Sequence, residues 1–219
     1  MLVERSLDPG WLSNAYLLAD EEGGAAVFVD SGAPMQPLLE AAERWHVRPR
    51  HVLRTHADPD HVAHEAELGV EVVTGPLEVG DLRIEALPTP GHSEDHLAFV
   101  VNGELCFSGD IVFKDAVGGG RDVPAIRRSV MDVLMKLPPE TRVLPGHTDE
   151  TTIGREWEEN PFVRYWRGLD PSVDEPCEVG GQEARIVVDS PDYDGKGKLL
   201  VRFADGREAI VGGSRVARN

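Results

Sequence analysis

The chain has 219 residues, of which 41% are hydrophobic and 28% are charged, a composition typical of a soluble globular protein. This length allows one sizeable core, or one core and a small module. The net charge of −17 repels phosphate backbones and anionic membranes, so we do not expect a nucleic-acid or membrane partner. The apolar runs are too short to cross a bilayer, and the N-terminus does not resemble a signal peptide, so we expect a cytoplasmic protein.

The first half of the chain predicts strands with one helix between them. Apolar runs at 14–20 and 25–30 flank the turn Glu21–Gly24 and indicate a hairpin. Apolar residues then recur at helical spacing over 36–45, which predicts an amphipathic helix. Residues 51–55 form a short strand that leads into a turn, where Asp58 suits the cap of a new helix.

The second half continues with strands and two further helices. Residues 97–101 and 104–110 predict a hairpin around Asn102–Gly103. The other predicted strands lie at 70–75, 82–89 and 142–147, and the predicted helices at 124–136 and 151–168. On the last helix we expect Glu156, Glu158 and Glu159 to form a solvated face.

The tail differs from the rest, because no helical period follows Pro171. Strand-like runs at 184–189, 198–203 and 208–212 are separated by the turn signals Asp194–Gly195 and Asp205–Gly206. We therefore predict a layered α/β domain over residues 1–170 and a small SH3-like β-barrel over residues 171–219.

Four short segments carry the residues that could bind metal. THADPDH places four of them, His56, Asp58, Asp60 and His61, within six residues. PGHSEDH, SGD and PGH then place His92, Asp110 and His147 directly after a glycine, at the predicted end of a strand. A glycine there lets the backbone turn sharply. Four such segments in this order are very unlikely to arise by chance.

These segments resemble the metallo-β-lactamase superfamily, in its glyoxalase II-like branch of small hydrolases. The family pattern is H-x-H-x-D-H, then Gly-His, then an Asp after Gly, then a second Gly-His. VDSG at 29–32 and TTIGREWEENPF at 151–162 also resemble that branch. The likeness covers about residues 10–168 and implies a four-layer αββα sandwich.

The resemblance also implies a dinuclear site. One divalent ion would bind His56, His92 and the residue at position 58, the other would bind Asp60, His61 and His147, and Asp110 would bridge them. Zinc is the expected metal, with iron or manganese as alternatives. Metal-bound hydroxide would be the nucleophile. Asp60 is expected to take part in catalysis, and His96 either in proton transfer or in a plain structural hydrogen bond.

Position 58 departs from the family pattern, because Asp58 stands where the pattern has His. A carboxylate oxygen is as many bonds from Cβ as the nearer imidazole nitrogen, so Asp58 can reach a metal without moving the backbone. The added negative charge makes both ions weaker Lewis acids and favours harder ions such as iron or manganese. The diiron flavoproteins of the superfamily resemble the chain in having an acidic residue there.

Other residues of these loops receive supporting roles. Asp30 in VDSG is expected to fix the loop near the ligands rather than to bind metal itself. Gly118–Gly120, followed by Arg121, predicts either a flexible substrate loop or a surface turn.

Four functions remain open. The leading one is hydrolysis of a small-molecule thioester or ester. The alternatives are iron-dependent dioxygenation of a sulfur or persulfide substrate, a ribonuclease, and a non-catalytic metal-binding scaffold whose tail binds a partner. The sequence also leaves a homo-oligomer open. Neither the substrate nor the role of the tail follows from the residues, since in such folds loops choose the substrate.

Overall fold

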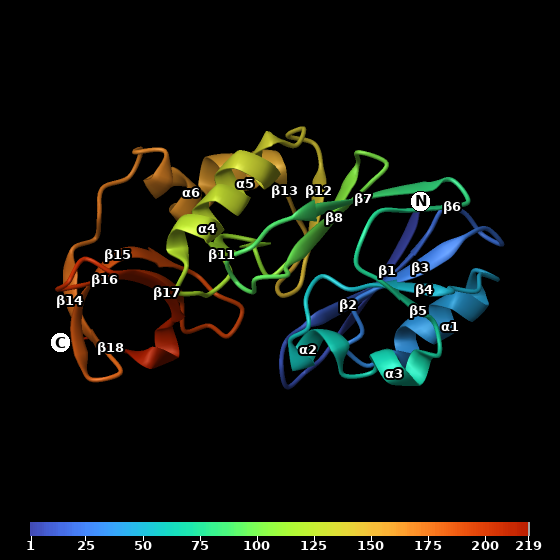
Figure 1. Ribbon diagram of the computed structural model, residues 1–219, viewed down its shortest axis with the longest axis horizontal. Helices are drawn as coiled ribbons and strands as arrows, with labels where there is room; N and C mark the ends of the chain where they lie inside the picture. Colours follow the sequence, from blue (N-terminus) through green and yellow to red (C-terminus); the bar gives the residue numbers. More distant parts are fainter. Residues whose placement is uncertain (219) are drawn as a thin grey trace.

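The computed structural model describes residues 1–218 (Figure 1). Its first sheet has the order β1-β2-β3-β4-β5 and consists of Leu2–Leu7, Asn14–Ala19, Ala26–Val29, His51–Leu53 and Glu71–Val73. The second has the order β13-β12-β9-β8-β7-β6 and consists of Thr151–Thr152, Arg142–Pro145, Leu105–Gly109, Leu97–Val101, Leu82–Pro88 and Leu77–Val79. A small hairpin pairs β10 and β11, Val112–Phe113 and Ala116–Val117.

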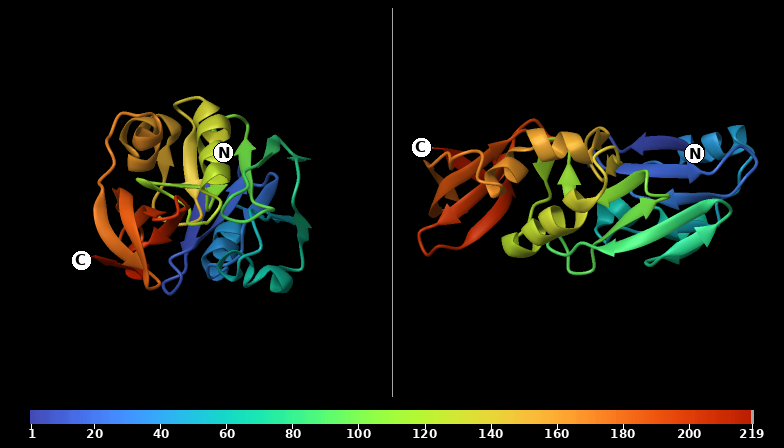
Figure 2. Two further views of the ribbon diagram at one scale, coloured as in Figure 1. Left: turned by 60° about the vertical axis from the view of Figure 1, so that its left-hand side comes forward. Right: turned by 90° about the horizontal axis from the view of Figure 1, so that it is seen from above.

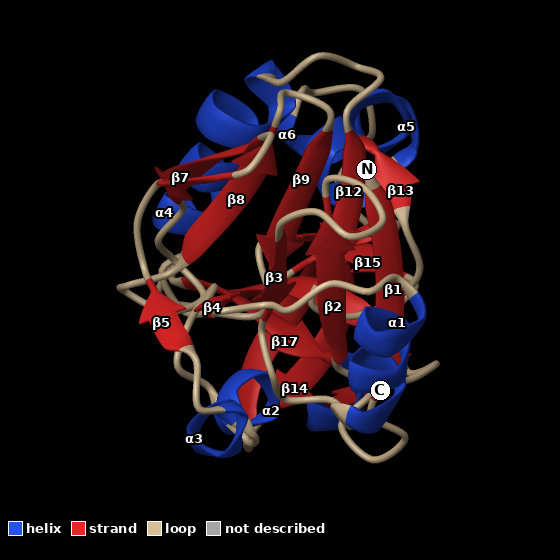
Figure 3. Ribbon diagram, turned by 90° about the vertical axis from the view of Figure 1, so that its right-hand side faces the viewer, coloured by secondary structure: helices blue, strands red, loops and turns tan. Residues whose placement is uncertain are grey.

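The two large sheets face each other and are covered by helices on their outer sides (Figure 3). Alternation along each strand produces these layers. In β2, Leu18 belongs to the core between the sheets together with Phe99 and Phe107, while Leu17 packs with Leu38 of helix α1. The helices on that side are α1, α2 and α3, at Gln36–Arg44, Pro59–Val62 and Glu65–Leu68. The predicted mixed α/β fold is therefore confirmed.

The second sheet buries its outer face under a different set of helices. Ala98, Cys106 and Val143 point to this side and join one core with α4, α5 and α6, at Val123–Arg128, Ile153–Glu159 and Pro161–Trp166. After α4 the chain continues as a π-helical turn at Ser129–Val133 and a 3₁₀ turn at Leu134–Lys136. Within residues 1–218, no helix is long and apolar enough to cross a membrane.

The single helix predicted over residues 151–168 was wrong. Residues 151–152 form strand β13, and α5 and α6 are separate helices that meet at Asn160. Pro161 has no N–H to continue the first helix. The Asn160 side chain caps the second helix by accepting hydrogen bonds from the N–H groups of Phe162 and Val163, at 3.0 and 3.4 Å.

The predicted solvated face of that segment was also wrong for Glu156, which is fully buried. Its carboxylate accepts hydrogen bonds from Thr151 Oγ1, the Asp115 N–H and Asn160 Nδ2, and it forms an ion pair with Arg155 at 2.7 Å. Glu156 therefore joins the start of α5, the start of α6 and the loop after β10. Helical periodicity could not reveal this, because the loop that buries Glu156 comes from far earlier in the chain.

The tail forms a curled five-stranded sheet of order β17-β16-β15-β14-β18. Its strands are Glu208–Gly212, Lys198–Phe203, Gln182–Ser190, Glu175–Val179 and Val216–Arg218, with a 3₁₀ turn at Gly213–Arg215. Because β17 and β18 are its two edge strands, the closed SH3-like barrel is not confirmed. The division of the chain at residue 171 stays a prediction.

The tail packs against the rest of the molecule through one face of its sheet. Ile186 and Val201 lie in a small core inside the curl, whereas Val187, Leu200 and Ile210 belong to the core under α4 and α6. The tail lies at one end of the long axis and the N-terminal sheet at the other (Figure 2). The tail sheet thus shares its hydrophobic core with the second large sheet.

The buried carboxylate of Glu156 provides a test of this packing. We expect Glu156→Ala to lower the free energy of unfolding by about 3 kcal/mol, because it leaves buried donors without partners. This loss corresponds to a fall in melting temperature of roughly 6 to 12 °C for a chain of this size. The control is Glu158→Ala, whose side chain is 66% exposed and should change stability by less than about 0.5 kcal/mol. Equal effects of the two variants, measured by calorimetry, would contradict the structure.

Candidate metal centre

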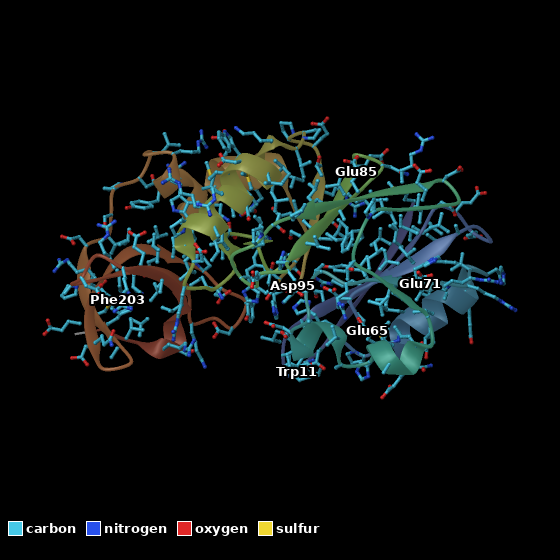
Figure 4. The ribbon with its side chains drawn as sticks, viewed as in Figure 1. Trp11, Glu65, Glu71, Glu85, Asp95 and Phe203 are labelled. Atoms are coloured by element: carbon cyan, nitrogen blue, oxygen red, sulfur yellow. The ribbon has the colours of Figure 1, made fainter. Side chains whose placement is uncertain are left out.

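All seven predicted ligands follow strands of the two large sheets, in loops or at the start of the next helix. His56 follows β4, His92 follows β7, Asp110 comes directly after β9 and His147 follows β12. Asp58, Asp60 and His61 lie at the start of α2. In Figure 4, Asp95, which stands between His92 and His96 in the chain, lies near the middle of the molecule. The structure therefore gathers these loops where the two sheets end together.

Four histidines are oriented by hydrogen bonds at their Nδ1 atoms. The partners are Thr55 Oγ1 for His56, Asp30 Oδ2 for His61, the Gly119 carbonyl for His92 and the Leu12 carbonyl for His147, at 3.0, 2.8, 2.8 and 2.8 Å. A carboxylate or carbonyl at Nδ1 selects the tautomer whose Nε2 is free to bind a metal. In all four residues, the nitrogen that remains is Nε2.

The remaining ligand atoms converge into three overlapping groups. The members of each group lie within 4.8 Å of one another: His56 with Asp58 and His92, His56 with His61 and Asp110, and Asp60 with His61 and His147. The first and third groups correspond to the two predicted metal sites, and the second lies between them. Asp58 Oδ2 is 3.2 Å from His92 Nε2, so aspartate at this position reaches the site as expected. The Asp58 carboxylate forms no hydrogen bond that caps α2.

Asp110 lies at the centre of the constellation. Its carboxylate oxygens are 3.3, 3.7 and 3.4 Å from Nε2 of His61, His92 and His147. Burial alone would raise the pKa of Asp110, but the two imidazoles of His61 and His147 hold it well below its usual range. Burial would likewise lower the pKa of these histidines, but Asp110 reverses this and raises the pKa of His147 to about 9. A divalent cation can replace these protons as the charge partner of Asp110.

Asp30 is not among the three ligand groups and supports two residues that are. It is buried and accepts hydrogen bonds from the Thr55 N–H and hydroxyl, both at 2.8 Å, as well as contacting His61 Nδ1. Thr55 in turn contacts His56. Asp30 therefore fixes the loop and the orientation of His61, as the sequence predicts.

Both ring nitrogens of His96 are engaged within the protein. Nδ1 lies 2.8 Å from Thr89 Oγ1, and Nε2 accepts a hydrogen bond from the Asp110 N–H at 2.9 Å. Its ring is buried, and burial lowers the pKa of His96 well below its usual value. The hydrogen bonds support the structural role considered for His96, because they hold the backbone of Asp110. A role in proton transfer stays a prediction.

Backbone geometry next to the ligands is unusual at several positions. Gly109 precedes Asp110 with a φ of 48°, and a β-carbon there would lie 2.6 Å from His96 Nε2. A β-carbon on Gly146 would overlap the Asp110 carboxylate. Leu12 and Thr148, which flank His147 in space and in sequence, have φ values of 60° and 69°. Strained backbone of this kind is concentrated at functional sites.

The tail contributes residues that the sequence analysis did not find. The Tyr193 ring, in the loop between β15 and β16, stacks on His147 with ring centroids 4.1 Å apart and an interplanar angle of 8°. On the other side, Ile210 of β17 pairs with Gly120, next to the Gly119 carbonyl that orients His92. Gly118–Gly120 is therefore packed between His92 and the tail sheet. The only sequence signal for Tyr193 was an aromatic residue within a polar turn.

The donor set fits divalent metal ions. His56 Nε2, His61 Nε2 and Asp110 Oδ1 are buried side-chain atoms that have no hydrogen-bond partner among residues 1–218. Buried polar groups are otherwise paired, and one left alone costs about 1–3 kcal/mol. Imidazole nitrogens together with carboxylate oxygens suit zinc, iron or manganese. Metal binding would satisfy all three atoms at once.

Comparison with known proteins identifies the class. No family model matches the chain. An uncharacterized protein of Aquifex aeolicus is 30% identical over 196 residues, covering 68% of this chain and 91% of the relative. The probable metallo-hydrolase YqgX of Bacillus subtilis is 26% identical over 69% of this chain and 92% of its own. A hydroxyacylglutathione hydrolase of Xanthomonas axonopodis is 33% identical over 57% of this chain and 56% of its own.

Solved structures agree with these relatives. The chain matches TTHA1623 in a di-iron-bound form with a TM-score of 0.56 and 32% identity, over 72% of this chain and 98% of that one. ETHE1 from Myxococcus xanthus matches with a TM-score of 0.63 and 26% identity, over 74% and 84%. BLEG-1 B3 metallo-β-lactamase matches in fold with a TM-score of 0.67 and 24% identity, over 74% and 99%. This chain belongs to the metallo-β-lactamase superfamily, whose fold implies that it binds divalent metal.

Metal removal tests the fit of this centre. Because a bound ion stabilises only the folded chain, metal at about 100 times its dissociation constant adds about 2.7 kcal/mol to the free energy of unfolding. Dialysis against a chelator should therefore lower the melting temperature by roughly 5 to 10 °C, and added zinc, iron or manganese should restore it. A melting temperature that is the same with and without the chelator would show that these residues hold no metal.

Proposed function

We propose that this chain is a dinuclear metal-dependent hydrolase of a small thioester or ester. The observation that carries the proposal is the convergence of four imidazole Nε2 atoms and three carboxylates into three overlapping groups. His56, Asp58 and His92 would hold one ion, Asp60, His61 and His147 the other, and Asp110 both. When bound, the ions supply a Lewis acid and lower the pKa of water from about 15.7 to about 7.

The ligands differ in exposure, which indicates the side from which water and substrate reach the site. The His56 and His61 side chains are fully buried, whereas the Asp58 and Asp60 side chains are 51% and 24% exposed. Water and substrate therefore enter on the side of these two aspartates. Asp60 would hold an ion together with His61 and His147, and its carboxylate would accept a hydrogen bond from the attacking water.

Hydrolysis itself adds water across the acyl bond. The water oxygen bonds to the carbonyl carbon, the bond from that carbon to sulfur or oxygen breaks, and the leaving group takes up a proton. The hydrogen bonds at the four Nδ1 atoms keep the imidazoles in place during this step. Such prepositioned charge in a buried site is a large source of rate enhancement.

The choice of substrate class rests on the relatives. The hydroxyacylglutathione hydrolase is named for a thioester substrate, and YqgX is named a probable metallo-hydrolase. The first name supports hydrolysis of an acyl bond, and the second supports metal-dependent hydrolysis without naming the bond. The match to the hydroxyacylglutathione hydrolase spans only 56% of that protein, so its particular substrate is not transferred to this chain.

A second candidate is iron-dependent oxidation of a sulfur or persulfide substrate. It is favoured by Asp58, which adds a hard carboxylate ligand, and by TTHA1623, which was solved in a di-iron-bound form. Oxygen consumption on a persulfide that depends on ferrous iron would distinguish it from hydrolysis. Zinc remains the metal we propose first.

Replacing the shared ligand tests the dinuclear hydrolase. Metal-loaded protein should hold about two ions per chain and hydrolyse small thioesters, while Asp110→Ala should lose both ions and lower kcat/KM by roughly a thousandfold. The measurements are elemental mass spectrometry and thiol release. Asp95→Ala is the matched control, because Asp95 is exposed in the His92–His96 loop and, within residues 1–218, its carboxylate accepts a side-chain hydrogen bond from Ser93 alone. Two bound ions without turnover on thioesters or esters would reject the hydrolase and leave the oxidation to be tested.

Asp58→His tests whether aspartate sets the choice of metal. Removing one negative charge makes the site less favourable for hard cations, so the variant should bind a larger share of zinc than the wild type. Both proteins are grown with equal zinc, iron and manganese, and their metal contents are compared. Identical metal contents would show that Asp58 does not control metal identity.

A further inference from the structure

A cavity of about 360 Å³ is lined by three residues that contact His147 or adjoin it in the chain. Thr148, the next residue in the chain, lines it, and so does Leu12, whose carbonyl holds His147 in place. Leu7, Pro191 and the Tyr193 ring supply further apolar surface. The cavity is therefore built jointly by the β1–β2 hairpin, the turn between β10 and β11, the loop after β12 and the loop between β15 and β16 of the tail.

The tail side of this cavity is held rigidly. Next to Tyr193 in the chain, Asp192 Oδ2 forms an ion pair with Lys198 Nζ at 2.9 Å, and the Lys198 and Asp192 side chains are only 7% and 2% exposed. Lys198 Nζ lies 5.1 Å from the centre of the Tyr193 ring, and Phe113 packs edge-on against that ring at 5.9 Å. A buried pair of this kind fixes the position of the loop, because each charge needs the other. The Tyr193 ring is thus held in place between His147 and Phe113.

More carboxylates than cations line the cavity, and one of its two cations forms no ion pair within residues 1–218. Three carboxylates line it, and each is in an ion pair: Asp115 with Arg155 at 2.7 Å, Asp149 with Arg5 at 3.0 Å and Asp192 with Lys198. Lys114 also lines the cavity, and within residues 1–218 its ammonium group forms no ion pair. Lys114 is therefore the cation of this lining that can pair with an anionic ligand.

We propose that this cavity binds the part of the substrate next to the scissile bond, and that this part is a short apolar chain ending in a carboxylate that pairs with Lys114. The Tyr193 ring and Leu12 contact the chain, so the tail helps to select the substrate. This inference rests on the proposed hydrolase function and names its substrate class. The carboxylate can belong either to the acyl group or to the leaving thiol, and both sources share the same recognition chemistry.

Matched thioester pairs test the proposal. One arm compares S-acetyl-3-mercaptopropionate with S-propyl thioacetate, and the other compares the S-methyl thioesters of adipic and hexanoic acid. In one of these arms the wild type should favour the charged member, and Lys114→Met should lower the ratio of the two kcat/KM values about tenfold, the worth of one charge-assisted contact. Lys196→Met is the control. Lys196 is exposed in the tail loop that carries Tyr193, and its replacement should leave the ratio of the two kcat/KM values unchanged.

The role of the tail is measured with the ring of Tyr193. Tyr193→Ala should raise KM for the favoured substrate severalfold more than Tyr193→Phe, which keeps the stacking on His147. Metal content and melting temperature, measured for both variants, separate this effect from loss of the centre or of the fold. Equal KM values for the two variants would show that the Tyr193 ring does not contribute to substrate binding.

The outcomes separate this inference from the proposed function. Turnover of the neutral thioesters with an unchanged charge ratio in Lys114→Met would keep the hydrolase and overturn the carboxylate cavity. If neither thioesters nor esters are turned over, the hydrolase fails, and ligand-observed NMR with adipate on the metal-loaded protein then tests whether the cavity binds a carboxylate. Binding that Lys114→Met weakens and Lys196→Met does not would support it, and binding that is equal in all three proteins would overturn it.

Discussion

The contact between the buried Asp110 carboxylate and the imidazoles that surround it constrains how the neighbouring loops are arranged. Burial opposes its charge, so the negative group is stable only with positive partners held at close range. Three Nε2 atoms approach it within 3.7 Å, on His61, His92 and His147. Each of these imidazoles is fixed from behind by a carbonyl or a carboxylate. Both large sheets, the loop between β1 and β2 and the loop Gly118–Gly120 therefore hold one arrangement of ligand atoms.

The tail extends this arrangement beyond what the ligands require. It shares a hydrophobic core with the second sheet through Leu200 and Ile210, so it is packed firmly against the rest of the molecule. Through Tyr193 it contacts His147, and through Ile210 it contacts the loop that orients His92. Both proposed metal sites therefore meet the tail on one side. A module in this position is suited to shaping the substrate cavity, while the metal chemistry stays with the superfamily fold.

Much of the fold was predictable, and the failures have local causes. The hairpin around Asn102–Gly103, the helix over 36–45 and the strand before His147 were predicted from periodicity and turn residues and are present. The helix predicted over 151–168 is broken at Asn160, where proline ends one helix and the asparagine side chain caps the next. Very short strands such as β10 and β13 carry too few residues for an alternating pattern to be recognised.

The sequence by itself determined the identity of the candidate ligands and the positions where the chain must turn, because histidine, aspartate and glycine at the ends of strands carry that information locally. It also determined that Asp58 departs from the family pattern. Only the tertiary structure decided that both nitrogens of His96 are engaged, that Glu156 is buried and that Tyr193 covers His147. Each of these facts depends on a partner distant in the chain, and local pattern cannot specify which distant surfaces will meet.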